Sequence, residues 1–87
     1  MGQFEKILAR VLSGVSDSNI IFTDLQKLLE RLGFICRIKG DHFIYTKEGV
    51  EEIINIQPLD NKAKAYQVKQ VRNIIIYYRM GGAVHEI

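Results

Sequence analysis

The spacing of apolar residues changes twice along this chain, and this change constrains the fold more than any other feature. Up to Leu32 the apolar side chains recur at positions three and four apart, as on one face of a helix. From Phe34 to Lys47 the period is two, which is typical of strands. Helical spacing returns at about Tyr66, after the single proline. The pattern predicts an α+β fold with the element order α-α-β-β-β-α, because helices and strands so close in sequence must share a core.

Three helices are expected, each with an apolar stripe for the core. A chain of 87 residues supports one core, so residues 1–87 are expected to form a single domain. The first helix covers about residues 3–13, and the second starts at a Thr-x-x-Gln capping box at Thr23 and stops at Gly33. The third follows a polar loop over 59–65 and ends at the glycines 81 and 82. The expected core residues of these helices are Phe4, Ile7, Leu8, Val11 and Leu12; Leu25, Leu28, Leu29 and Leu32; and Val68, Val71, Ile74, Ile75 and Tyr78.

The Gly40-Asp41 dipeptide predicts a β-hairpin between the first two strands. Glycine at the first central position suits a two-residue type II′ turn, which fixes the register of the strands. The residues that this register places opposite each other are Lys39 and His42, Arg37 and Ile44, and Cys36 and Tyr45. A third strand is expected over about residues 51–57, which completes a three-stranded antiparallel sheet.

The register divides this sheet into an apolar face and a polar face. The apolar face, which is expected to lie under the helices, carries Phe34, Cys36, Ile38, Phe43 and Tyr45. The open face carries Arg37, Lys39 and His42, and Asn55 and Gln57 are expected beside them. With the helices packed on one face, an imidazole and two cations are left on the other.

Charge and cysteine content exclude several classes of protein. Twelve Lys and Arg against ten Asp and Glu give a formal charge of +2, and with 47% hydrophobic residues this is not a disordered chain. Residues 61–87 carry five basic side chains and one acidic one, which suggests an anionic partner such as nucleic acid. The single cysteine argues against a disulfide-dense secreted domain, and no apolar run approaches the roughly 20 residues of a membrane span. A cytoplasmic protein with no membrane partner is therefore expected.

His42 is the candidate catalytic residue. A ribose 2′-hydroxyl attacks the neighbouring phosphodiester when a base removes its proton and cations stabilise the charge on the phosphoryl oxygens. The competing interpretation is that a lone histidine beside a tight turn, like Arg37 and Lys39, is simply solvated. Cys36 is interpreted as a structural thiol, and His85 forms no metal-ligand pattern with His42, so neither a metal nor another cofactor is expected.

Three segments of the chain resemble the HicA family, also described as YcfA-like, of toxins from bacterial toxin-antitoxin pairs. They read FTDLQKLLERLGF, ICRIKGDHFIYTKEG and IINIQPLDNKAKAYQVKQVRNII, and the resemblance covers about residues 22–79, after the extra helix at 3–13. It implies a fold like the double-stranded-RNA-binding domain and cleavage of messenger RNA by one essential histidine in a Gly-Ser-His motif. Gly40, Asp41 and His42 match that motif, with Asp41 in place of the serine and Phe43 where a second histidine is frequent.

The resemblance also implies a partner, a HicB-type antitoxin that covers the face bearing the histidine. The resulting hypothesis is a metal-independent endoribonuclease, an mRNA interferase, in which His42 is the acid/base catalyst. The residues expected to contact RNA, on the open face and on the side of the last helix opposite its apolar stripe, are Arg37, Lys39, Gly40, Lys69 and Arg72. Two alternatives stay open, a non-catalytic RNA-binding module of the same fold and a protein-interaction domain that uses the basic helix.

Overall fold

The computed structural model describes residues 2–80 and confirms an α+β fold. In chain order its elements are α1 (Gln3–Ser13), the 3-10 turn η1 (Asp17–Asn19), α2 (Phe22–Arg31), β1 (Ile35–Lys39), β2 (His42–Lys47), β3 (Val50–Ile56), β4 (Pro58–Leu59), β5 (Lys62–Ala63) and α3 (Ala65–Tyr77). The three longer strands form an antiparallel sheet in the order β1-β2-β3, and β4 and β5 form a separate two-stranded ladder. The predicted order of three helices and three main strands is confirmed, with one short hairpin added.

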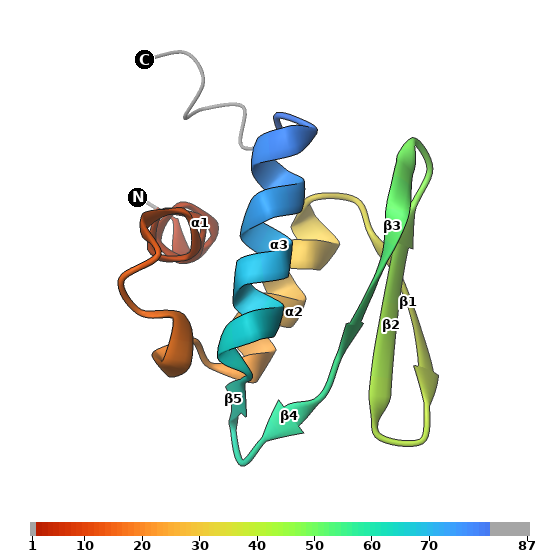
Figure 1. Cartoon of the computed structure of the whole chain (residues 1–87), viewed down its shortest axis with the longest axis horizontal. Coiled ribbons are helices and arrows are strands. Elements are labelled where there is room, and N and C mark those ends of the chain that lie inside the picture. The colour runs from red at the N-terminus through yellow and green to blue at the C-terminus, as the bar shows by residue number, and fades with distance from the viewer. Residues whose placement is uncertain (1, 81–87) are drawn as a thin grey trace.

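The helices form two layers beside the main sheet (Figure 1). α2 and α3 lie along one face of the sheet, and α1 lies on the far side of α3, where it packs against both of these helices. None of the described helices covers the other face of the sheet. One hydrophobic cluster joins the layers, with members from every helix and from β2 and β3. α1 therefore enlarges the core and leaves the polar face of the sheet open.

The hairpin of β1 and β2 has the predicted register. Lys39 lies opposite His42, and the pairs farther from the turn match the prediction as well. Gly40 has a φ of 63°, in the left-handed region that a type II′ turn requires at its first central position. β3 then pairs with β2 so that Asn55 lies opposite Ile44. Because residues paired across strands share a face, Asn55 lies on the open face with His42.

The covered face of the sheet is narrower than predicted. Tyr45, Ile54 and Ile56 are fully buried, but the prediction that Ile38 is buried with them is wrong, because this residue is 65% exposed. The reason is the position of β1 at the edge of the sheet, while α3 packs on β3 at the opposite edge. β1 therefore extends beyond the cover of the helices, and Cys36 on this strand is only half-buried.

α2 begins at Phe22, and the predicted capping box at Thr23 is wrong. The residue before the helix is Ile21, and no side chain caps the helix. Backbone pairing marks the start instead, because the N–H of Phe22 donates to the carbonyl of Asn61 at 2.9 Å and Ile21 forms a bridge with β5. The predicted stop at Gly33 is confirmed, since this residue has a φ of 98°, as glycines that follow helices commonly do.

α3 buries most of its predicted apolar stripe but ends earlier than expected. Val68, Val71, Ile74 and Ile75 are buried, whereas Tyr78 is half-buried just past the last helical residue. The glycines at 81 and 82, where the helix was expected to end, lie outside the described residues. No helix in the described part of the chain is long and apolar enough to span a bilayer.

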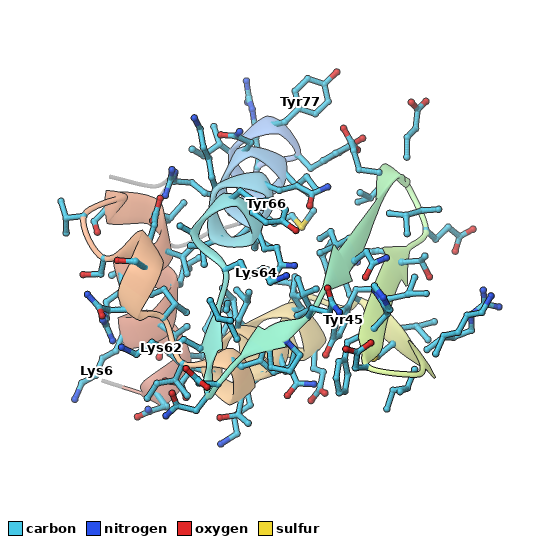
Figure 2. All side chains as sticks on the ribbon, turned by 60° about the horizontal axis from the view of Figure 1, so that its bottom comes forward. Lys6, Tyr45, Lys62, Lys64, Tyr66 and Tyr77 are labelled. Atoms are coloured by element: carbon cyan, nitrogen blue, oxygen red, sulfur yellow. The ribbon has the colours of Figure 1, made fainter. Side chains whose placement is uncertain are left out.

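The segment 59–65 is more ordered than the polar loop expected there. β4 pairs with β5 across a turn in which Asp60 has a left-handed φ of 58°. The N–H of Ala63 donates to the carbonyl of Ile20 at 2.9 Å, which ties this hairpin to the segment before α2. The pairing directs two nearby lysines to different surroundings: Lys62 lies nearer α1 and Lys64 nearer the sheet (Figure 2).

Candidate functional site

His42 begins β2 directly after the turn, and its ring lies on the open face of the sheet. The ring atom Nδ1 is 3.0 Å from Oδ1 of Asn55 on β3. An amide oxygen only accepts hydrogen bonds, so in this contact Nδ1 carries the hydrogen and donates it. Nε2 then holds the lone pair and is the ring nitrogen that can take up a proton. Since 45% of the His42 side chain is exposed, the ring is accessible from the open face.

Asp41 lies next to the imidazole. Its Oδ1 is 3.7 Å from Nε2 of His42. Its Oδ2 accepts a hydrogen bond of 2.9 Å from Nε2 of Gln57. This hydrogen bond is the main cause that lowers the pKa of the Asp41 carboxyl below its ordinary value, and the charge of Lys64 acts in the same direction. The carboxylate is thus held in its ionised form beside the ring.

The structure brings the predicted residues of the open face together. Lys39 lies directly opposite His42 across the hairpin, and Arg37 lies two positions back along β1 on the same face. Both are exposed, and among the described side chains neither forms a salt bridge. A Cβ added to Gly40 would meet no atom within 4 Å, so this glycine serves the turn through its backbone conformation. The open face therefore presents two unpaired cations beside an oriented imidazole.

Lys69 and Arg72 lie apart from this site. α3 packs on the covered face of the sheet, so neither residue shares the open face with His42. Nη1 of Arg72 donates to both carboxylate oxygens of Asp17, at 2.8 and 3.1 Å, and to the carbonyl of Val11 at 3.2 Å. Only 15% of the Arg72 side chain is exposed, and it joins α3 to η1 and to α1. This placement argues against the predicted contact between Arg72 and RNA, while Lys69 is exposed on α3.

Two side chains to which the sequence assigned no role complete the site. Nζ of Lys64 donates to Oε1 of Gln57 at 3.4 Å, so a chain of contacts runs from Lys64 through Gln57 and Asp41 to His42. The period of two in β3 placed Gln57 on the open face but gave it no partner. The position of Lys64 depends on the hairpin of β4 and β5, and the segment 59–65 has no apolar period that would have indicated it.

The remaining candidate residues form no second site. Ile35 and Ile53 bring apolar surface to the sheet, with 70% and 61% of their surfaces exposed. Cys36 is half-buried opposite Tyr45, in keeping with a structural thiol. His85 lies outside the described residues. Within residues 2–80, no three His, Cys, Asp or Glu side chains gather as metal ligands would.

No protein-family model, no curated protein and no solved structure matches this chain. The resemblance to the HicA family therefore stays a prediction that rests on the residues quoted above.

Proposed function

We propose that this protein is a metal-independent endoribonuclease of the HicA family, the messenger-RNA-cleaving toxin of a type II toxin-antitoxin pair. The observation that carries the proposal is the environment of His42. Its Nδ1 is engaged by Asn55 at 3.0 Å, which leaves Nε2 as the proton-accepting atom on an exposed sheet face. Arg37 and Lys39 lie beside it on the same face. These are the residue types that RNA cleavage by the ribose 2′-hydroxyl requires.

In the proposed reaction, Nε2 of His42 takes the proton of a ribose 2′-hydroxyl. The 2′-oxygen attacks the adjacent phosphorus, the bond from phosphorus to the 5′-oxygen breaks, and that oxygen receives a proton from the imidazolium or from water. The products are a 2′,3′-cyclic phosphate and a free 5′-hydroxyl. Arg37 and Lys39 stabilise the negative charge that builds on the non-bridging oxygens. A single positioned acid/base group contributes roughly 10²- to 10⁴-fold, so a modest rate is expected.

The proposal extends to fold family, partner and location. The element order and the helices on one face of the sheet support a fold like the double-stranded-RNA-binding domain. A HicB-type antitoxin would cover the open face, to which the exposed Ile35 and Ile53 add apolar surface and Arg37 and Lys39 add positive charge. Apolar contacts flanked by cations suit an acidic protein partner. The pair would act in the cytoplasm.

The test compares the wild-type protein with two variants on a labelled RNA in EDTA. His42→Ala should lose cleavage by at least about a hundredfold, because it removes the acid/base group. Thr46→Ala, at an exposed position of the same strand, is the matched control and should cleave normally. Undiminished cleavage by His42→Ala would exclude the proposed mechanism.

Two further outcomes identify the alternatives. Salt-sensitive RNA binding without cleavage by the wild type would indicate a non-catalytic RNA-binding module, and no RNA binding at all would indicate a protein-interaction domain. In cells, expression of the chain alone should arrest growth, and co-expression of the adjacent open reading frame should relieve the arrest. Normal growth in both cultures would contradict the toxin assignment.

A further inference from the structure

The carboxylate of Asp41 marks a position on the open face that favours an anion. Its Oδ2 accepts the hydrogen bond of 2.9 Å from Gln57, and its Oδ1 lies 3.7 Å from Nε2 of His42. The lowered pKa of this carboxyl has the Gln57 amide as its first cause, and the charge of Lys64 contributes. The Gln57 amide thus donates to the carboxylate, and the ammonium of Lys64, which contacts the same Gln57 side chain, adds a positive charge nearby.

A phosphodiester offers the same kind of acceptor as this carboxylate, namely two oxygens that share a negative charge. The groups around Asp41 that can hold such an anion are the Nε2 amide of Gln57 and the ammonium of Lys64. The side chains of Gln57 and Lys64 are linked to each other at 3.4 Å. Asp41 connects them to the imidazole that the proposed reaction uses.

A buried residue fixes the backbone of Gln57. Gln67 on α3 is 2% exposed, and its side-chain amide oxygen accepts a hydrogen bond from the backbone N–H of Gln57. The amide donor of the anion position is therefore anchored to the core. Asp41, in contrast, has 71% of its side chain exposed in a two-residue turn, so its carboxylate is free to rotate away.

We propose that Gln57 and Lys64 form a binding subsite for a phosphodiester group of an RNA strand next to His42, and that the Asp41 carboxylate occupies this subsite in the free protein. The proposal rests on the proposed ribonuclease function and adds two residues to its substrate contacts. It places the RNA backbone between the end of β3, which Gln57 follows, and the start of α3, which Lys64 precedes. It also gives Asp41, which stands where HicA toxins usually have serine, a role as an internal competitor of the substrate.

Two lysines of this hairpin provide a matched test. Lys62 and Lys64 are two positions apart, but Nζ of Lys62 donates to Asn19 at 3.2 Å, on the η1 side. Affinity is measured for an RNA oligomer with 2′-O-methyl riboses, which binds without being cleaved. Lys64→Gln should weaken binding roughly fivefold and reduce the slope of log K against log salt by about 0.7, as expected for one lost phosphate contact. Lys62→Gln removes the same charge and should stay within about twofold of wild type. Equal losses in the two variants would overturn the subsite.

A second pair of variants tests the competition. Asp41→Asn keeps the shape of the side chain but removes its charge, so it should tighten RNA binding by several fold. Asp60→Asn removes an exposed carboxylate from the turn between β4 and β5 and should have a much smaller effect. The gain from Asp41→Asn should shrink when Lys64→Gln is also present, because both act at one position. Unchanged or weaker binding by Asp41→Asn would overturn the competition and with it the proposal.

The outcomes separate this inference from the proposed function. The expected binding pattern together with a wild-type protein that does not cleave RNA would support the subsite and contradict the ribonuclease. Cleavage that depends on His42, with equal effects of Lys62→Gln and Lys64→Gln, would support the ribonuclease and contradict the subsite. No salt-sensitive RNA binding by the wild type would contradict both.

Discussion

Arg72→Gln is expected to lower the stability of the fold and to leave RNA affinity nearly unchanged. One guanidinium nitrogen donates to both oxygens of Asp17, at 2.8 and 3.1 Å, and to the carbonyl of Val11 at 3.2 Å. A hydrogen bond to a charged group contributes about 1.5–3 kcal/mol, and removal of one partner from a fully buried pair costs about 3–5 kcal/mol. The two side chains are 15% and 21% exposed, which places this pair between an exposed one and a buried one. The expected loss is therefore about 2–3 kcal/mol.

Equilibrium unfolding in urea measures this loss, and thermal unfolding should show a Tm lower by about 10–20 °C for a domain of this size. Lys69→Gln is the matched control, because it removes a cation from an exposed position of the same helix. Its free energy of unfolding should stay within about 0.5 kcal/mol of wild type. A double-mutant cycle of Arg72→Gln with Asp17→Asn should give a coupling energy above about 0.5 kcal/mol.

The opposite pattern would refute this reasoning. If Arg72→Gln unfolds with the wild-type free energy but binds RNA several fold more weakly, the guanidinium contacts nucleic acid and the ion pair with Asp17 contributes little. A coupling energy near zero in the cycle would lead to the same conclusion. In that case the placement of Arg72 would carry no argument against its role at an RNA surface.

Three other substitutions test separate parts of the structure. Tyr45→Phe should leave the free energy of unfolding unchanged or raise it by up to about 1 kcal/mol, because the hydroxyl that it removes is buried without a hydrogen-bond partner among the described residues. A clearly lower free energy of unfolding in urea would reveal a partner. Gly40→Ala should lose about 1–2 kcal/mol in thermal unfolding, since the left-handed φ of 63° is strained for alanine while its Cβ would meet open space; an unchanged Tm would mean that the turn relaxes. Asn55→Ala should reduce cleavage about fivefold, as expected for one lost hydrogen bond, with RNA affinity unchanged. Nitrogen NMR of the His42 ring should then show more of the tautomer that carries its hydrogen on Nε2, and an unaltered tautomer would contradict the positioning role.

The sequence predicted most accurately what is decided within a few residues. The Gly40-Asp41 turn fixed the register of β1 and β2, and every predicted pair is found. A period of two then placed Asn55 and Gln57 on the face that carries His42. These predictions hold because turn chemistry and the alternation of side chains along a strand act locally.

The errors concern features that depend on how the layers are placed. The alternation along β1 puts Ile38 on the covered side, but it does not show that β1 is the edge strand beyond the helices. The residues around Thr23 have the form of a capping box, yet the helix starts where the backbone of Phe22 pairs with the segment after β4. In both cases a contact between distant segments overrides a local pattern.

The basic residues show that a local sequence pattern cannot decide which cations are available to a partner. The helical spacing of α3 correctly indicates that Arg72 lies outside the apolar stripe, but nothing in that spacing reveals that η1 brings Asp17 to it. Lys64 has no periodic context at all, and only the pairing of β4 with β5 places it beside Gln57. Arg72, on a helix, thus joins α3 to η1 and α1, whereas Lys64, in a segment predicted as a loop, contacts Gln57 at the sheet. Charge therefore predicts an anionic partner for such a chain, and the contacts of each cation decide which of them can meet it.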